Sequence, residues 1–183
     1  RLDRDTSGLI LLARDAESHR RLSAAFAERR VRKTYLARVH GVPAARRGWI
    51  EQPLGRIATR PPRYGVVPLA RGGKPAVSRW RRLDRLLQVH RCPGPGGPDR
   101  PCSRGLGWCT LVLQPHTGRS HQLRVHLAWL GHPVLGDPLY AHTCCPGGPP
   151  VSRLQLHAAG LRLLHPITGR PLRLRCAGNW ADL

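Results

Sequence analysis

Two stretches of the sequence combine acids, hydroxyl groups and cations at a spacing that could do chemistry. The first is RLDRDTSG at residues 1–8, in which Asp3 and Asp5 precede a Thr-Ser-Gly turn. Asp, Ser and Thr side chains often accept hydrogen bonds from nearby backbone amides, so turn capping is one role for these residues. A carboxylate in a cleft can also act as a nucleophile or stabilise developing charge. The spacing alone leaves both roles open.

The second stretch, at residues 116–140, is rich in His and Arg. Arg119 and Arg124 flank a His-Gln pair at the predicted start of a helix. Helix N-termini attract anions, so this stretch predicts an anion site even without catalysis. His116, His121 and His126 recur every five residues, which fixes no common face, and the six cysteines form no C-x-x-C pair. We therefore expect no metal site.

The charge balance is strongly basic. Lys and Arg number 31 against 10 Asp and Glu, a formal charge of +21, and only Lys33 and Lys74 are lysines. Such a field attracts polyanions, and we expect nucleic acid rather than membrane. The chain has no apolar run of about 18 residues and no basic amphipathic helix with bulky apolar anchors. We expect a monomer in the cytoplasm with reduced thiols.

The hydrophobic pattern predicts two helices, at 16–30 and 122–130, among many short strands. Asp15 is the expected N-cap of the first helix. The apolar run at 9–13 predicts a buried strand, and the alternation at 33–39 predicts a half-buried one that carries Tyr35. Further strands are predicted at 77–80, 86–89, 108–113 and, as two runs about a turn, within 154–174. This order of elements predicts an α+β domain around a largely antiparallel sheet.

Several motifs together resemble one known family. RLDRDTSG resembles the H-R-L-D-x-x-T-S-G signature of the RluA-type pseudouridine synthases, which isomerise uridine to pseudouridine in rRNA and tRNA. Lys33-Thr34-Tyr35 resembles the family's K-x-Y element, and Gly73-Lys74-Pro75-Ala76 resembles its G-K-x-A strand. Residues 117–140 are similar to its second long signature, and 156–172 to its closing strands. Agreement of several motifs in the family's order carries more weight than any one motif.

The resemblance implies an α+β pseudouridine-synthase fold, with a mixed, mainly antiparallel sheet, flanking helices and a central active cleft. It further implies that residues 1–183 are one catalytic domain that lacks its N-terminal part, because the family's histidine before R-L-D is missing. The Pro- and Gly-rich stretch at about 91–107 is then a disordered hairpin insertion.

The resemblance also implies roles for individual residues. Asp3 matches the catalytic aspartate, Tyr35 the active-site tyrosine, Arg124 the arginine that pairs with the aspartate, and Leu123 a side chain that lies against the uracil. The reaction needs no cofactor and no metal. The residues expected to bind the substrate are Arg1, Leu2, Arg4, Thr6, Ser7, Gly8, Lys33, Lys74, Arg119, His121, Gln122 and Leu123.

Other functions remain open at this stage. A non-catalytic RNA-binding domain explains the charge equally well, although an acid such as Asp3 facing RNA would weaken binding. A metal-dependent nuclease needs several clustered acids, and the chain offers only Asp3 and Asp5 together. The spacing alone also favours a core role for Tyr35 over a catalytic one. The motifs do not show whether the RNA is rRNA or tRNA, nor which uridine is modified.

Overall fold

The computed structural model describes residues 1–88, 107–141 and 151–178. The predicted insertion at about 91–107 therefore lies outside the described residues, Gly107 excepted. The elements are β1 (Ser7–Gly8), α1 (Ala16–Ala27), β2 (Arg32–His40), β3 (Arg47–Ile50), β4 (Leu54–Thr59), β5 (Pro62–Val66), the short 3₁₀ helix η1 (Leu69–Arg71), β6 (Ser78–Gln88), β7 (Trp108–Pro115), α2 (Gln122–Trp129), β8 (Leu156–Leu164) and β9 (Pro171–Arg175). None of the helices in these ranges is long and apolar enough to cross a membrane.

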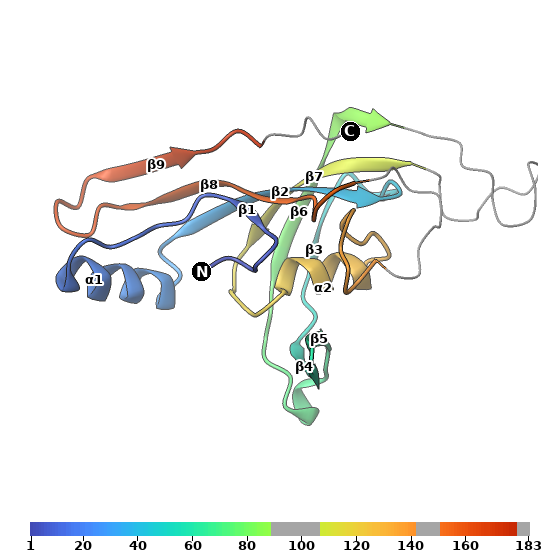
Figure 1. Ribbon diagram of the computed structural model, residues 1–183, viewed down its shortest axis with the longest axis horizontal. Coiled ribbons are helices and arrows are strands. Elements are labelled where there is room, and N and C mark those ends of the chain that lie inside the picture. Colours follow the sequence, from blue (N-terminus) through green and yellow to red (C-terminus); the bar gives the residue numbers. More distant parts are fainter. Residues whose placement is uncertain (89–106, 142–150, 179–183) are drawn as a thin grey trace, which may run out of the picture.

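Seven strands form one mixed sheet in the order β1-β8-β2-β7-β6-β3, and β9 pairs with the same edge of β8 as β1 does. Only the β1–β8 pair is parallel, so the sheet is mainly antiparallel, as predicted. The β4–β5 hairpin stands apart as a second, two-stranded sheet. Both helices lie on the same side of the large sheet (Figure 1).

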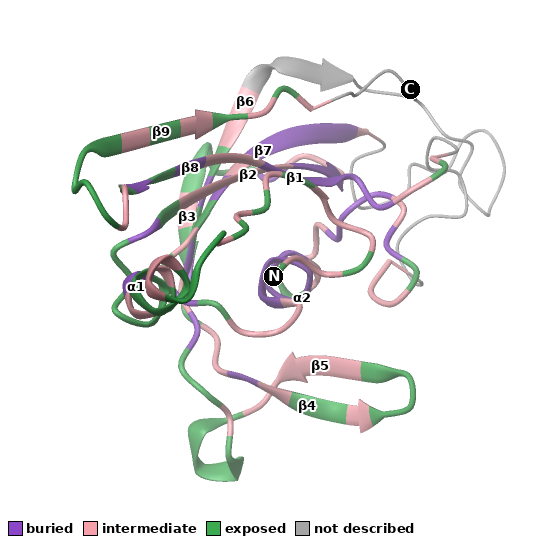
Figure 2. Cartoon of the chain, turned by 60° about the vertical axis from the view of Figure 1, so that its left-hand side comes forward, coloured by how far each residue is buried: buried purple, intermediate pink, exposed green. Residues whose placement is uncertain are grey.

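The helices cover this side in two separate apolar clusters. Leu123 and Leu127 of α2 pack on the centre of the sheet, against side chains such as Leu111 of β7. Ala25 and Leu22 of α1 pack on the β8–β9 end, against a cluster that also contains Val31, Leu161, Leu163, Leu172 and Leu174. In Figure 2, α2 and β7 are mostly purple, whereas α1 is mostly pink and green, so α2 is the more deeply buried helix. The two helices thus pack on different parts of the sheet.

Most of the predicted elements are confirmed. Asp15 caps α1, since its Oδ1 accepts a hydrogen bond of 2.7 Å from the backbone N–H of Ser18. Helix α1 ends at Ala27, three residues earlier than predicted, and Arg29 follows with a left-handed φ of 60°. Residues 78–80 and 86–88 of the two strands predicted at 77–80 and 86–89 belong to one strand, β6, and residue 89 lies outside the described residues.

The predicted strand at 9–13 is wrong. Only Ser7 and Gly8 pair with β8, and the next five residues are not in a strand. Beyond Ala158, the outer edge of β8 is already occupied by β9 from Gly160 onwards, so no strand edge remains for residues 9–13. Leu9 and Leu11 pack on the α1 cluster, but Ile10 and Leu12 are 57% and 81% exposed. The apolar run alone could not reveal that β9 occupies the edge of β8 with which residues 9–13 would have to pair.

Gly8 allows the N-terminal segment to lie against β8. Its φ is +110°, and a Cβ at this position would overlap the backbone of Ala158. The sequence predicts that Gly8 binds substrate. In the structure, the absence of a side chain lets the backbone of Gly8 lie against the backbone of Ala158. Because β1 has only two residues, this contact holds the segment that carries Asp3.

We predict that Gly8→Ala destabilises the protein more than Gly169→Ala does. Gly169 has a φ of +69° with nothing near the missing Cβ, so its substitution measures the backbone strain alone, roughly 1 kcal/mol. Gly8→Ala adds a clash with Ala158, which should cost a further 1 to 3 kcal/mol, roughly the cost of overpacking. Urea unfolding of both variants measures the difference, and equal losses would contradict the packing argument.

Candidate active site

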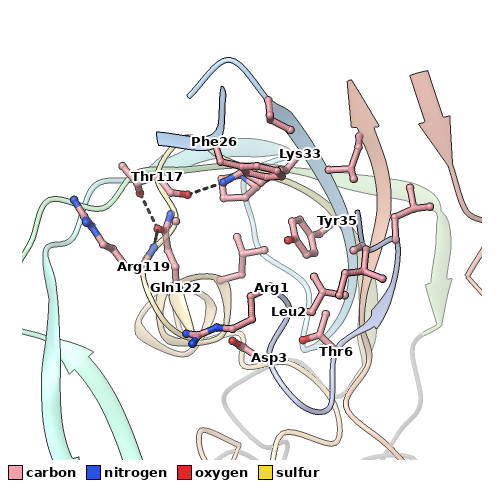
Figure 3. Close-up of a pocket in the computed structure, with 18 of the residues that line it drawn as sticks. Arg1, Leu2, Asp3, Thr6, Phe26, Lys33, Tyr35, Thr117, Arg119 and Gln122 are labelled. Atoms are coloured by element: carbon pink, nitrogen blue, oxygen red, sulfur yellow. Dashed lines mark hydrogen bonds between the residues drawn. The ribbon is translucent and has the colours of Figure 1, made fainter. Parts of the chain in front are cut away.

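A cavity of about 590 Å³ opens on the helix-bearing side of the sheet. Its walls come from the N-terminal turn, the end of α1, β2, the loop before α2, the first residues of α2, and β8. Figure 3 shows Asp3 and Thr6 projecting into it from the N-terminal segment, and Lys33 and Tyr35 from β2. Elements far apart in the sequence thus contribute polar side chains to one cavity.

Most of the predicted site residues line this cavity. They are Arg1, Leu2, Asp3, Thr6, Lys33, Tyr35, Arg119, His121, Gln122 and Leu123. The structure does not bring the others to its wall. Arg4 is exposed and pairs with Asp5 at 3.1 Å. Lys74 forms backbone hydrogen bonds with Leu54 while its side chain is exposed.

Ser7 and Gly8 also lie outside the cavity wall, in β1. The Ser7 hydroxyl lies 2.9 Å from Nδ1 of His157 and accepts a hydrogen bond of 3.2 Å from Arg153. Nε2 of His157 lies 3.3 Å from the Cys176 carbonyl oxygen, and the Ser7 hydroxyl also lies 3.4 Å from the Leu156 carbonyl oxygen. Ser7 therefore fastens the N-terminal segment to β8 rather than facing a ligand.

Asp3 is not a turn cap. The turn is closed by the backbone, since the Thr6 N–H donates to the Asp3 carbonyl oxygen at 3.0 Å. The Asp3 side chain is 26% exposed, and its nearest charged partner in the described chain is Arg124, at 3.7 Å between Oδ2 and Nη1. This carboxylate is held in the cavity beside a cation and remains accessible to a ligand.

Arg124 is buried beneath the cavity and makes its closest contacts elsewhere. Its Nε and Nη2 donate hydrogen bonds of 2.7 and 2.8 Å to the two carboxylate oxygens of Asp137. Both side chains are nearly inaccessible, at 3% and 0% exposure. Burial alone would lower the pKa of Arg124, but Asp137 raises it and the net shift is upward. The predicted partner, Asp3, is therefore the second and more distant acid.

Asp137 is not among the residues predicted from the sequence, yet it organises the floor of the site. Its Oδ1 also accepts hydrogen bonds from the backbone N–H groups of Leu139 and Tyr140. The Tyr140 hydroxyl accepts one from the Tyr64 N–H at 3.0 Å and lies 2.8 Å from Nδ1 of His121. The sequence did offer one signal for Asp137, because it is an acid inside the long 117–140 motif of a chain that has few acids.

Tyr35 is placed by β2 with its ring in the cavity. Burial raises the pKa of its hydroxyl, and the negative charge of Asp3 raises it further, so the phenol keeps its proton at neutral pH. On the same strand, Nζ of Lys33 donates to the Thr117 carbonyl oxygen at 3.2 Å. Burial, with the charge of Arg29 adding to it, lowers the pKa of Lys33. The cavity thus holds a proton-bearing phenol close to an acid.

Gln122 lines the cavity but has no free hydrogen-bonding capacity. Its Oε1 accepts from the Thr117 hydroxyl at 2.7 Å and from the Arg119 N–H at 3.0 Å. Its Nε2 donates to the Val77 carbonyl and the Ser78 hydroxyl. The sequence predicts that Gln122 binds substrate, whereas its contacts are those of a residue that holds the loop before α2.

The same network continues into the buried ring of His126. Nε2 of His126 donates to the Gln52 carbonyl oxygen at 3.0 Å, so Nδ1 is the acceptor, 2.9 Å from the Ser78 hydroxyl. The ring is fully buried, and desolvation lowers its pKa despite the opposing effect of the Gln52 carbonyl. Neutral His126 therefore supports the loop through Ser78 and Gln122.

Comparison with known proteins identifies the class of enzyme that has this fold and site. Residues 1–129 match the family model described as RNA pseudouridylate synthase. The dual-specificity RNA pseudouridine synthase RluA of Yersinia pestis is 39% identical over 180 residues, which cover 98% of this chain and 77% of that protein. The solved structure of human RNA Pseudouridylate Synthase Domain Containing 1 has a TM-score of 0.77 and 29% identity, with 97% of this chain and 67% of that chain covered.

A further relative, described as an uncharacterised RNA pseudouridine synthase of Zymomonas mobilis, is 39% identical over 164 residues. These residues are 89% of this chain but 64% of that protein. The fold class is thus that of the pseudouridine synthases. The chain belongs to the RNA pseudouridylate synthase family, and its similarity to the RluA proteins makes it an RluA-type member.

We predict that Asp137→Asn destabilises the protein strongly, whereas Asp3→Asn does not. Losing Asp137 removes the closest counter-charge of a buried guanidinium, which should cost about 3 to 5 kcal/mol. Asp3 is partly exposed and more distant, so its loss should cost less than about 1 kcal/mol. Urea unfolding of both variants tests this order. The reverse order would show that Asp3 is the principal structural partner of Arg124.

We also predict that stability falls on acidification because of His126. Its pKa is depressed in the folded state, so its contribution is complete above the unfolded value of about 6.5 and is lost as the pH falls towards the folded value. The free energy of unfolding should therefore decrease between pH 7.5 and pH 5.5. His126→Asn should flatten this decrease, although the variant starts from a lower stability. An unchanged slope in the variant would exclude His126 as a source.

Proposed function

We propose that this chain isomerises uridine to pseudouridine in RNA, with Asp3 as the essential carboxylate. The observation that carries the proposal is the position of Asp3. Its side chain caps no turn, reaches the cavity, and lies 3.7 Å from a buried arginine that a second acid already neutralises. Membership of the pseudouridylate synthase family supports this assignment.

The reaction breaks the bond between N1 of uracil and C1′ of the ribose and joins C1′ to C5 of the same base. C5 then loses its proton and N1 gains one, so that the product is an isomer of the substrate. A carboxylate can hold the intermediate, either by covalent attack or by stabilising positive charge. It must be ionised to do either. RNA that closes over the cavity removes water and favours the protonated acid, and the Arg124 charge opposes this. Asp137 ensures that Arg124 itself is fixed and charged.

Tyr35 and Leu123 form the proposed seat for the base. The Leu123 side chain lines the cavity and offers an apolar surface to one face of uracil. The Tyr35 ring can stack on the base, and its hydroxyl, which keeps its proton at neutral pH, can exchange that proton during the isomerisation. His121 and Arg119 line the same cavity on the α2 side, where they can bind the phosphates on either side of the uridine.

We further propose that the RNA is rRNA or tRNA and that the protein acts as a monomer in the cytoplasm. The printed name of the Yersinia relative, a dual-specificity RNA pseudouridine synthase, supports more than one RNA substrate. The net charge of +21 supports binding through the phosphate backbone. We also propose that residues 1–183 form a single catalytic domain.

The decisive experiment compares Asp3→Asn with Asp5→Asn, in a parent protein that forms pseudouridine. Both variants lose one negative charge from the same turn, but Asp5 pairs only with exposed Arg4. Asp3→Asn should form no detectable pseudouridine, while Asp5→Asn should keep most of the activity. Both should bind RNA at least as tightly as the parent, because a negative charge has left a cationic surface.

Conversion by Asp3→Asn at a rate close to that of the parent would overturn the catalytic assignment. A non-catalytic RNA-binding domain predicts instead that parent and both variants bind RNA and that none of them forms pseudouridine. Melting temperatures of all three proteins show whether any loss of product follows from unfolding.

A further inference from the structure

Arginines from three neighbouring strands lie directly opposite one another on the side of the sheet that carries no helix. Arg32 of β2 pairs in register with Arg162 of β8, and Arg162 with Arg173 of β9. Arg175 lies two residues further along β9, on the same face. These four residues are the arginine row.

The direction of the row follows from the alternation of side chains along each strand. Leu161 and Leu163 of β8, and Leu172 and Leu174 of β9, belong to the cluster beneath α1. The arginines between them therefore point away from α1, and all four are exposed. In Figures 1 and 2 both helices lie on the opposite side of this part of the sheet.

Such a row is unfavourable without an anion. Like charges directly opposite each other on adjacent strands destabilise a sheet. In the described ranges, no hydrogen bond or ion pair engages the side chains of the row, and most acids have arginine partners elsewhere. Asp5 pairs with Arg4, Glu17 with Arg20 and Arg21, Glu28 with Arg30, and Asp137 with Arg124. The arginine row is thus a cluster of positive charges that no acid of the described ranges neutralises.

The surface beside the row is hollowed. A depression of about 430 Å³ is lined by Arg162, Arg173 and Arg175, with Thr34 and Gly160 among its other residues. A Cβ at Gly160 would meet Thr34 and Leu174 at 3.6 Å, so the bare glycine leaves the floor open. Three guanidinium groups around an open floor suit the tetrahedral, multiply accepting oxygens of a phosphodiester.

We propose that the arginine row is a second RNA-binding surface, which holds the backbone of a segment remote from the target uridine. The proposal rests on the proposed function and names a further contact of the same substrate. Neighbouring strands are about 4.8 Å apart and alternate residues about 6.7 Å, so the row extends over roughly 10 Å and can contact two or three phosphates.

The position of the row limits which RNA can use it. Gly160 and Leu161 line both the active-site cavity and the depression, so the two sites are back to back across β8. A ligand that occupies both must pass around the sheet, for example over the edge strand β9, which pairs only with β8. A short stem-loop that fills the cavity cannot also reach the row, whereas a folded RNA of tRNA size can.

The experiment compares two double variants that lose the same charge. One is Arg162→Gln with Arg173→Gln. The control is Arg47→Gln with Arg81→Gln, a second exposed pair of arginines opposite each other, on β3 and β6, which line no described depression. Binding is measured for bulk tRNA and for a uridine-containing stem-loop of about 17 nucleotides, from 50 to 200 mM salt.

The row variant should bind tRNA about tenfold more weakly than the parent protein does. Its plot of log affinity against log salt concentration should have a slope shallower by about 1.4 to 2, as the loss of two phosphate contacts requires. Its affinity for the stem-loop should equal that of the control, and its melting temperature should not fall, because repulsion has been removed. If both double variants lose the same affinity for tRNA, the row contributes only through the net charge of the protein, and the proposal is overturned. Equal weakening on both RNAs would overturn it too.

These binding measurements do not depend on turnover. The same difference between tRNA and stem-loop should persist in an Asp3→Asn background. A protein that shows this difference but forms no pseudouridine would refute the proposed function and leave the second RNA-binding surface standing.

Discussion

The buried pair of Arg124 and Asp137 is the interaction on which the site depends. It joins the first turn of α2 to the segment before Tyr140 through two hydrogen bonds of 2.7 and 2.8 Å. A buried arginine without a partner would be too costly to keep, and Asp137 meets that requirement without using Asp3. The Asp3 carboxylate can consequently face the cavity while it remains close to the positive charge of Arg124. The Arg124–Asp137 pair thus fixes the guanidinium that the Asp3 carboxylate faces.

The sheet separates two kinds of electrostatic environment. On the helix side, the buried polar groups of the network through Gln122 and His126 each have a hydrogen-bond partner. That network fixes the loop before α2, so His121 and Arg119 enter the cavity from a rigid frame. On the bare side, the positive charges are exposed and close to one another. The first environment suits chemistry on one nucleotide, and the second suits attraction of a long polyanion.

Periodicity and motifs predict much of this from sequence, and their failures have physical causes. The α1 cap at Asp15 is a local interaction between residues three apart, so a local pattern reveals it. The run at 9–13 is apolar, but whether it forms a strand depends on whether β9 has taken the edge of β8, which is a long-range fact. Gln122 was predicted to bind substrate; it lines the cavity, and its four hydrogen-bond partners, which no sequence pattern reveals, hold the loop before α2. Asp137 and Arg124 are 13 residues apart, and no helical or strand period links them.

The two-residue strand β1 has a consequence for the way in which activity could be lost. Asp3 is carried by a segment attached to β8 through Ser7, Gly8 and the Leu9 N–H, while the rest of the sheet is held by long antiparallel ladders. Detaching this segment breaks far fewer contacts than unfolding the domain, so it forms its own low-energy opening unit. In solution, the carboxylate would leave the cavity during each such opening while Tyr35 and Arg124 stay in place. With Asp3 as the proposed catalytic carboxylate, the fraction of molecules with a complete site would be set by a local equilibrium at the edge of β8, and only indirectly by the stability of the core.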